Sequence, residues 1–566
     1  MKNFKMEVAN LLEPHVEGMN AQEIYETIEF PKHPEMGDFA FPCFKLAKVF
    51  RKAPNMIAAE IAENIGSSAD FEAIESLAAY INFKVDRAAF AASVINAVHE
   101  QGEAFGGSTE GEGKNVIVEF SSTNIAKPFH MGHIRSTMIG NSLYRIWTAL
   151  GYNTTAINHL GDYGTQFGKL IVAYKLWGSK EDIEADPIPE LLKIYVKFHE
   201  EAEEKPEMEV EARGWFTKLE NGDQEAYDLW AWFREVSLKE FSRVYDMLDV
   251  HFDSFAGESF YSDKMPAILE ELRSKNVVQK SQGAEIVDLE EYGMPPSLIT
   301  KSDGSTLYVT RDLAAAKYRK DHYDFHKNIY VVGAAQQLHF KQWMKIIELM
   351  GYEWAKDCVH VEFGMVGLEE GSLSTRKGRV VFLEDVLKQA VAKTAEIIQE
   401  KNPNLENKDE VAKAVGVGAV VFQELSNNRI KDYTFSWERT LSFEGETGPY
   451  VQYTHTRCCS VLRKAKVDWK QDVDFSLLSE DVAKDIVRLL SKFPKTVQDA
   501  AYKYEPSLIT RYIVNLAQAF NRFYHETPIL VDDPALAKAR TALVAATAQV
   551  LKNGLYLISL KAPEKM

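Results

Sequence analysis

Between residues 116 and 133 the chain reads Val116-Ile117-Val118-Glu119-Phe120-Ser121-Ser122-Thr123-Asn124-Ile125-Ala126-Lys127-Pro128-Phe129-His130-Met131-Gly132-His133. The first five residues form a short, mostly apolar run that begins with three β-branched residues, which predicts a buried strand. From Ile134 to Leu150 apolar residues recur at helical spacing, and Gly151 supplies a stop for that helix. The polar residues between them therefore form a loop at the carboxyl end of a strand, just before a helix.

Further short apolar runs at 329–332 and 359–361 alternate with helical segments, which indicates a parallel α/β sheet. Between the runs, residues 180–260 are acidic, rich in Trp and Glu and helix-prone, which indicates an insertion. From about residue 381 onward the pattern is almost wholly helical, so we expect an α-helical C-terminal domain.

Residues 1 to about 105 contain amphipathic helical stretches around an irregular segment, Pro31–Asp38. The Gly-, Ser- and Glu-rich segment Gly106–Gly113 then predicts a loose linker, because such residues cannot form a core. We therefore expect three domains, over residues 1–110, 114–380 with its insertion at about 180–260, and 381–566.

The composition is that of an ordinary globular protein, with 46% hydrophobic and 26% charged residues. No apolar run approaches the roughly 20 residues of a membrane helix, and the N-terminus lacks an apolar secretory core. We therefore expect a cytoplasmic enzyme. None of the four cysteines lies in a C-x-x-C pair, so neither a structural zinc site nor a disulfide framework is indicated.

The net charge of −18 at first argues against a nucleic-acid partner. Residues 441–566, however, hold 17 Lys and Arg against 14 Asp and Glu, a local +3 that leaves −21 for the other 440 residues. Because salt confines electrostatic interactions to about 8–10 Å, such a region can still follow phosphates. Charge alone therefore neither establishes nor excludes RNA binding.

The loop 121–133 has the residue types of a nucleotide site. Helix N-termini beyond the carboxyl ends of parallel strands present free N–H groups to phosphates, and Gly132 allows a flat base to approach the backbone. His130 and His133 lie on one side of a turn and can donate hydrogen bonds to phosphoryl oxygens. They could instead be surface residues or metal ligands, although no third ligand is nearby. A lone HxGH leaves several nucleotidyl-transferring families open.

The segment His130-Met131-Gly132-His133 resembles the HIGH motif of class I aminoacyl-tRNA synthetases. The longer run Glu119–His133 resembles the arginyl enzymes in particular. Three further blocks and the C-terminal Ala562–Met566 agree with that family in order and approximate distance; the blocks are Leu160–Gly168, Tyr308–Ala314 and Ser372–Gly378. The resemblance implies an α/β plus all-α protein: a Rossmann-type parallel-sheet catalytic domain with a helical insertion, an α-helical C-terminal anticodon-binding bundle, and a small α/β N-terminal RNA-binding domain.

The resemblance also implies the chemistry of a ligase used in translation. The carboxylate of arginine attacks the α-phosphorus of ATP, with Mg²⁺ on the phosphates, and the adenylate then yields its arginyl group to the 3′-terminal adenosine of tRNA(Arg). Gly132 would bind ATP together with the two histidines. Ser372–Arg376 lacks both lysines of the KMSKS pattern, and Lys127 would supply the missing cation. The implied catalytic residues are His130, His133, Lys127, Arg376 and Lys377.

For arginine itself, the resemblance places Glu119 and Asn124 at the α-amino end, with His130 and Gln336 nearby. Tyr308 and Asp312 would face the guanidinium, and their i, i+4 spacing gives them one face if a helix begins there. Plainer interpretations stay open. Asp312 could be a helix N-terminal carboxylate, Lys127 an exposed lysine, and the adjacent Gln337 could replace Gln336.

Aromatic residues interleaved with arginine in the C-terminal region suit the stacking of unpaired bases, although aromatics at helical spacing are more often core. With the family resemblance, this predicts RNA contacts at Tyr453, Arg457, Arg522, Tyr524 and Met566. The N-terminal region would meet the tRNA elbow. The expected partners are tRNA(Arg), arginine and ATP, with no membrane, and we expect a monomer.

Three rival interpretations remain open at this point. A cysteinyl or glutamyl synthetase would share the class I motif, although a cysteinyl enzyme needs a zinc-ligand set that the scattered cysteines do not provide. An adenylyltransferase for a small cofactor precursor would leave more than 400 residues after the motif unexplained. An inactive paralogue would be expected to have a damaged ATP motif, whereas His130, Gly132 and His133 are intact.

Overall fold

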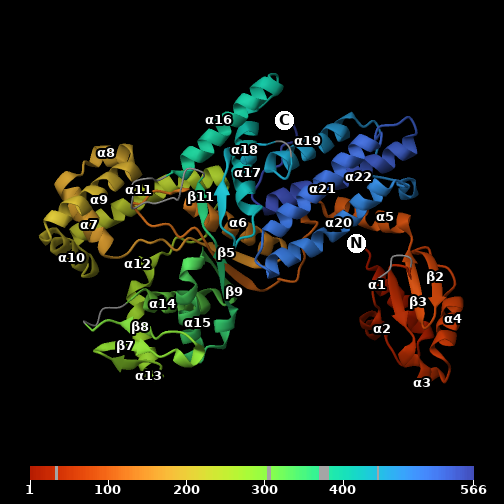
Figure 1. Cartoon of the computed structure of the whole chain (residues 1–566), viewed down its shortest axis with the longest axis horizontal. Coiled ribbons are helices and arrows are strands. Elements are labelled where there is room, and N and C mark those ends of the chain that lie inside the picture. The colour runs from red at the N-terminus through yellow and green to blue at the C-terminus, as the bar shows by residue number, and fades with distance from the viewer. Residues whose placement is uncertain (32–35, 303–306, 369–380, 443–444) are drawn as a thin grey trace. The chain divides into compact units, whose positions relative to one another are not determined.

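The computed structural model describes residues 1–31, 36–302, 307–368, 381–442 and 445–566 (Figure 1). The chain forms two compact units, each made of three stretches. The first unit comprises Met1–Phe105, Thr454–Pro494 and Asn515–Asn553. The second comprises Gly106–Tyr453, Lys495–Val514 and Gly554–Met566.

A four-stranded parallel sheet in the second unit has the strand order β10, β9, β4, β5. Its strands are β4 (Asn115–Glu119), β5 (Asn153–Ile157), β9 (Phe325–Gly333) and β10 (Cys358–Phe363). The strands predicted at 116–120, 329–332 and 359–361 are thus confirmed. From β4 the chain moves to β5 on one side and later to β9 on the other. Such a reversal opens a crevice at the carboxyl ends of β4 and β9, as in Rossmann-type folds.

Helices connect and cover these strands. They are α6 (Ile134–Ala149) after β4, α14 (Tyr308–Tyr323) before β9, and α15 (Gln337–Leu349) between β9 and β10. The predicted end of α6 is confirmed, since Gly151 has a φ of 85°, just after the C-cap Leu150. One buried core joins both strands and helices; it includes Ile117, Ile157, Leu313, Tyr330 and Trp343.

The polypeptide between β5 and β9 forms most of the second unit's remaining helices, as its acidic, helix-prone sequence predicted. The helices are α7 (Thr165–Trp177), α8 (Lys180–Ala185), α9 (Pro187–Glu204), α10 (Glu207–Glu220), α11 (Gln224–Leu248), α12 (Glu258–Tyr261) and α13 (Met265–Ser274). Figure 1 shows α7 to α10 gathered in one bundle. A small antiparallel sheet follows, with β6 (Gln279–Ser281), β7 (Ala284–Val287) and β8 (Ser297–Thr300).

The segment Gly106–Gly113 is packed, so the prediction of a loose linker is wrong. The backbone N–H of Ser108 donates to the carbonyl of Ala149, and that of Gly111 donates to the carbonyl of Leu150, each at 3.0 Å. The last carbonyls of a helix lack partners within the helix, and this segment satisfies two of them at the end of α6. A Cβ at Gly111 would lie 2.3 Å from the Tyr152 ring, so the packing is close as well.

The described residues beyond 381 are mostly helical, as predicted. They also include the short strand β12 (Tyr433–Phe435), which pairs in parallel with β11 (Val366–Leu368). The helices are α16 (Leu383–Lys401), α17 (Lys408–Leu425), α18 (Trp437–Thr440), α19 (Gly448–Lys464), α20 (Asp481–Tyr502), α21 (Ser507–Glu526) and α22 (Pro534–Leu557). This confirms the helical C-terminal part of the fold.

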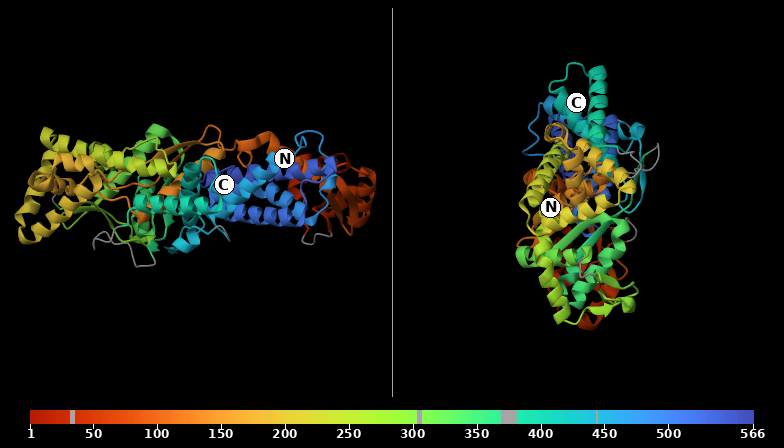
Figure 2. Two further views of the ribbon diagram at one scale, coloured as in Figure 1. Left: turned by 90° about the horizontal axis from the view of Figure 1, so that it is seen from above. Right: turned by 90° about the vertical axis from the view of Figure 1, so that its left-hand side faces the viewer.

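The N-terminal segment combines helices with a three-stranded antiparallel sheet, in the order β1, β3, β2 (red in Figures 1 and 2). The elements are α1 (Phe4–Leu12), α2 (Ala21–Thr27), β1 (Phe39–Pro42), α3 (Ala47–Phe50), α4 (Pro54–Ile65), β2 (Phe71–Leu77), β3 (Tyr80–Val85) and α5 (Arg87–Gln101). The small α/β domain that the resemblance implied is confirmed. The pattern analysis named only its helices, although Ile81, Phe83 and Val85 alternate in β3 and are buried.

Candidate active site

The loop after β4 has a strained backbone. Ser121, Ser122 and Ala126 have φ values of 68°, 48° and 58°, in the left-handed region that residues with a side chain rarely adopt. Each such residue costs on the order of 1–3 kcal/mol and persists only where its surroundings hold it. Here the Ser136 hydroxyl accepts the N–H of Ser121 at 2.9 Å, and the Ser237 hydroxyl of α11 accepts the N–H of Ala126 at 3.1 Å.

The HxGH residues form a short turn that continues into α6. The N–H of Gly132 donates to Nδ1 of His130 at 3.0 Å, and the N–H of His130 donates to Nδ1 of His133 at 3.1 Å. A backbone N–H can only donate, so each Nδ1 is an acceptor and each ring carries its proton on Nε2. The two rings lie 3.9 Å apart between centroids. The turn therefore prepares two Nε2–H donors side by side.

Both histidines are held in the neutral form. Burial, together with the neighbouring charge of His130, lowers the pKa of His133 to about 3. Burial also lowers the pKa of His130. Neutral imidazoles can donate hydrogen bonds to a phosphate without forming an ion pair with it. Such donors suit a phosphate that is bound and released in each turnover.

Gly132 is required by the histidines themselves. A Cβ at this position would lie 2.8 Å from Cε1 of His130 and 3.0 Å from its Nδ1. The sequence suggested that Gly132 makes room for a flat base. In the structure it makes room for the His130 ring, which packs over it and receives its N–H.

The predicted cation Lys127 is exposed, and desolvation by the surrounding protein still lowers its pKa. The charge of Lys127 makes a small contribution to the lowered pKa of His133, after the larger effects of burial and of His130. The other predicted cations, Arg376 and Lys377, lie outside the described residues.

The residues predicted for the α-amino end lie around the carboxyl end of β4. Glu119 is buried and pairs with Arg319 of α14, whose Nη1 lies 2.5 Å from its Oε2. Asn124 is exposed, and its Oδ1 lies 2.2 Å from where a Cβ of Gly161 would be. Gln336 is exposed in the turn before α15, while the adjacent Gln337 donates to Glu362 at 2.8 Å.

Tyr308 and Asp312, which were predicted to face the guanidinium, lie in the first turns of helix α14. Their i, i+4 spacing therefore places them on one face. Tyr308 is the first residue of α14, one turn before Asp312, and 64% of its surface is exposed. Oδ2 of Asp312 lies 2.5 Å from Nε2 of His339, at the start of α15. Asp312 therefore lies at the edge of the crevice beyond β9 and has a cationic or donor partner already.

The structure adds a carboxylate that the sequence analysis missed. Oε2 of Glu258 lies 3.3 Å from Nη1 of Arg311. Burial raises its pKa to about 7; Arg311 opposes the rise and the charges of Asp312 and Asp162 increase it. Asp162, from the block Leu160–Gly168, is fully buried and accepts the N–H of Ser259 at 2.9 Å, which holds the neighbouring Glu258 in place. No local pattern marks Glu258, since 96 residues separate it from Asp162 and 54 from Asp312.

The predicted RNA-binding residues have mixed surroundings. Arg457 lies 4.9 Å from the ring centroid of Tyr524, and its Nη1 donates to Asn521. Arg522 pairs with Asp485 at 3.2 Å. Tyr453 and Tyr524 are 43% and 40% exposed, whereas the carbonyl of Met566 accepts from Asn402 at 3.1 Å. The structure thus brings Arg457 and Tyr524 together as a stacked pair.

In the part of the chain that the structure describes, none of the helices has the length and apolarity that crossing a membrane needs. The same residues contain no group of three or more His, Cys, Asp or Glu side chains able to hold a metal ion.

Comparison with protein families accounts for nearly the whole chain. Residues 94–437 match the family model of the catalytic domain of class I tRNA synthetases (R). Residues 451–566 match the DALR anticodon binding domain, and residues 2–85 match the arginyl tRNA synthetase N-terminal domain. The matches follow one another in the order of the structural elements described above.

Curated relatives match from end to end. The arginine–tRNA ligase of Clostridioides difficile (strain 630) is 62% identical over 566 residues, which is 100% of both chains. That of Halothermothrix orenii is 60% identical over the same length and coverage, and that of Alkaliphilus metalliredigens is 57% identical.

Solved structures share the fold. Arginyl-tRNA synthetase from Thermus thermophilus superimposes with a TM-score of 0.78 at 23% identity, covering 99% of this chain and 100% of the other. The enzyme from Plasmodium falciparum gives 0.75 at 24% identity, covering 100% of both chains. The family matches and the full-length identity lead to one conclusion: the chain belongs to the arginine–tRNA ligases, the arginyl members of the class I aminoacyl-tRNA synthetases.

Proposed function

We propose that this ligase activates arginine at the crevice beyond β4 and β9 and transfers it to tRNA(Arg). The carboxylate of arginine attacks the α-phosphorus of ATP, forming arginyl-adenylate and releasing pyrophosphate. The ribose hydroxyl of the 3′-terminal adenosine of the tRNA then attacks the carbonyl of the adenylate, and AMP leaves. Such phosphoryl chemistry depends on positioning and on stabilising charge, which suits a site with no covalent nucleophile.

The observation that carries this proposal is the pair of Nε2–H donors made by His130 and His133. Both Nδ1 atoms accept backbone N–H groups, so neither ring can turn its acceptor toward a phosphate. Two fixed neutral donors at a helix N-terminus match the negative charge that grows on phosphoryl oxygens in the transition state. Gly132 binds ATP with them, and Lys127 adds a mobile positive charge on the same side. Arg376 and Lys377 are proposed to add charge from the Ser372–Gly378 block.

Specificity for arginine comes from carboxylates at the far side of the crevice. A guanidinium offers five donors in a fixed plane and pairs best with carboxylate oxygens. Burial raises the pKa of Glu258 to about 7 and the charge of Asp312 adds to the rise, so a bound guanidinium would stabilise both carboxylates. The exposed ring of Tyr308 is available to stack on or bond with the same group. Glu119, Asn124, His130 and Gln336 are proposed to receive the α-amino end.

We propose that Mg²⁺ arrives with ATP as part of the substrate. The ATP phosphates are proposed to supply most of its ligands, because Mg²⁺ in such sites is usually bound by substrate phosphates and water. The enzyme is proposed to act as a cytoplasmic monomer. Sedimentation of the purified chain tests the oligomeric state.

We propose that tRNA(Arg) is bound through the helical C-terminal region and the N-terminal segment. Tyr453, Arg457, Arg522, Tyr524 and Met566 are the proposed contacts there. The stacked Arg457 and Tyr524 provide a flat cationic platform for an unpaired base. Footprinting of the RNA on the chain tests these positions.

The activity is tested by ATP–pyrophosphate exchange with arginine, glutamate and cysteine, each with and without tRNA. We expect exchange with arginine alone, and arginine that becomes linked to RNA when ATP and tRNA are present. Exchange with glutamate or cysteine and none with arginine would overturn the proposal. Exchange without any RNA-linked arginine would favour an adenylyltransferase.

A further inference from the structure

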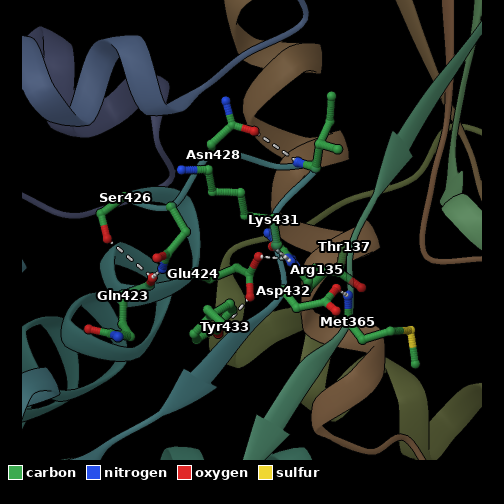
Figure 3. Close-up of polar contacts among 12 residues, drawn as sticks. Arg135, Thr137, Met365, Gln423, Glu424, Ser426, Asn428, Lys431, Asp432 and Tyr433 are labelled. Carbon is green, nitrogen blue, oxygen red and sulfur yellow. Dashed lines mark hydrogen bonds and ion pairs between the residues drawn. The ribbon is translucent and has the colours of Figure 1, made fainter.

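A buried charged cluster lies directly behind the HxGH turn. Arg135 of α6 and Glu424 of α17 are 1% and 0% exposed, and Nε of Arg135 donates to Oε1 of Glu424 at 2.7 Å. The hydroxyl of Tyr433 in β12 donates to the other carboxylate oxygen, Oε2, at 2.7 Å. Figure 3 shows the three side chains meeting between their elements. The guanidinium of Arg135 also lies 5.2 Å from the ring centroid of Tyr433.

Stability alone does not explain this arrangement. Removing two charges from water costs about as much as their attraction returns, so a buried ion pair adds little to the stability of a fold compared with apolar packing. What such a pair does supply is direction, because each hydrogen bond has one geometry. Arg135 uses two of its nitrogens in this way, since its Nη1 also donates to the carbonyl of Lys431 at 2.8 Å.

The residues around Tyr433 hold the strand that follows β10. The N–H of Met365 donates to Oδ1 of Asp432 at 2.6 Å, and the N–H of Tyr433 donates to the carbonyl of Met365 at 3.1 Å (Figure 3 shows the first of these bonds). β11 and β12 then pair in parallel from Val366 and Tyr433 onward. Arg135 therefore links α6 to β11 through Lys431, Glu424 and Tyr433.

On the other side, the HxGH turn is joined to the start of α16. The N–H of Met131 donates to the carbonyl of Val381 at 3.1 Å, and the N–H of Leu383 donates to the carbonyl of Phe129 at 3.0 Å. The strand β11 and the start of α16 are thus both connected to the element that carries the two histidines. The cluster of Arg135, Glu424 and Tyr433 makes the connection to β11.

We propose that Arg135, Glu424 and Tyr433 are positioning residues for adenylate formation, a role that rests on the proposed function. Arg135 follows His133 by two residues. The hydroxyl of Thr137 donates to the carbonyl of His133 at 2.8 Å, which connects His133 to the first turn of α6. The cluster fixes that turn against β11 and β12. It acts on the reaction through the placement of His130 and His133 and touches no substrate.

The chain offers a closely matched control on the same helix. Arg145 is also buried, and it bonds the carboxylate of Asp249 at 2.8 Å and two backbone carbonyls, those of Asp249 at 2.8 Å and Tyr556 at 3.0 Å. Its guanidinium also lies beside a tyrosine ring, 4.7 Å from the centroid of Tyr556. It differs in facing residues that are not joined to β11 or β12. Arg145→Lys therefore also shortens a buried, hydrogen-bonded arginine of α6, here paired with a carboxylate that is 48% exposed, without the proposed effect on the histidines.

The experiment measures ATP–pyrophosphate exchange with saturating tRNA, the Kd of arginine and the Tm for Arg135→Lys, Tyr433→Phe and Arg145→Lys. We expect Arg135→Lys and Tyr433→Phe to lower kcat by about tenfold to a hundredfold, since displacing reacting groups by about 1 Å can cost that much. The Kd of arginine should change by less than about twofold, and Arg145→Lys should keep kcat within about twofold while lowering the Tm similarly.

A kcat in both cluster variants that stays within about twofold of the Arg145→Lys value would overturn the positioning role. If Arg135→Lys does not fold, Tyr433→Phe decides, because it deletes a single hydroxyl. A wild-type chain without arginine-dependent exchange would instead refute the proposed function, and the positioning role with it.

Discussion

Replacing Glu258 with glutamine should make the ligand-free enzyme more stable at pH 8. The pKa of Glu258 rises from its ordinary 4.5 to about 7, mainly through burial. Each pKa unit is worth about 1.4 kcal/mol, so keeping this carboxylate ionised costs the folded state about 3 kcal/mol. The cost develops as pH rises through 4.5 and is complete above 7. Glutamine carries no charge, so Glu258→Gln should gain up to about 3 kcal/mol at pH 8 and nothing below pH 4.5.

The same carboxylate should make arginine binding depend on pH. A guanidinium pairs with the ionised form, and with a pKa of about 7 about one-eleventh of Glu258 is ionised at pH 6 and ten-elevenths at pH 8. The Kd of arginine in the wild type should therefore fall about tenfold between these pH values. Glu258→Gln should remove the dependence and weaken binding by roughly 10- to 150-fold, because a hydrogen bond to a charged group contributes about 1.5–3 kcal/mol.

Thermal unfolding at pH 4.5 and 8, and calorimetric titration with arginine at pH 6, 7 and 8, measure both effects. Glu271→Gln serves as a control of opposite sign. Against the opposing effect of burial, hydrogen bonds from Lys275 and Tyr352 lower the pKa of Glu271, so its loss should cost stability at pH 8. Glu258→Gln with no rise in Tm at pH 8, together with a flat Kd in the wild type, would refute the reasoning.

Three further substitutions test the two ends of the crevice. Lys127→Ala should lower kcat for pyrophosphate exchange by about 10²-fold with the Kd of arginine little changed, because it removes a charge aimed at the phosphates; an unaltered kcat would contradict the role of Lys127. Gly132→Ala should displace the His130 ring, since its Cε1 lies 2.8 Å from the new Cβ, and should lower kcat/KM for ATP about tenfold or more. A variant as active as the wild type would show that the ring can shift without loss of activity. Asp312→Asn should raise the KM for arginine by roughly 10- to 150-fold and leave the KM for ATP unchanged, and equal effects on both substrates would point to a folding defect.

The sequence was most informative where short-range patterns carry the signal. The apolar periodicities of the sequence predict β4 and α6. The residues between them show neither periodicity, which predicts a loop. The N-terminal sheet was missed because β1 pairs with β3 some forty residues later, and such a pairing leaves only a weak local trace. The segment Gly106–Gly113 was misjudged because composition cannot show that the end of α6 needs its N–H groups.

The sequence by itself predicted a nucleotide site after β4 with His130 and His133 as its candidate donors, and its motifs indicated the arginyl class. Only the tertiary structure decided which nitrogen of each ring donates, that Glu119 is held by Arg319, and that Glu258 joins Asp312. The physical reason is separation along the chain. A motif is local, whereas the pKa of a carboxyl and the partner of a buried arginine depend on groups that only packing brings together.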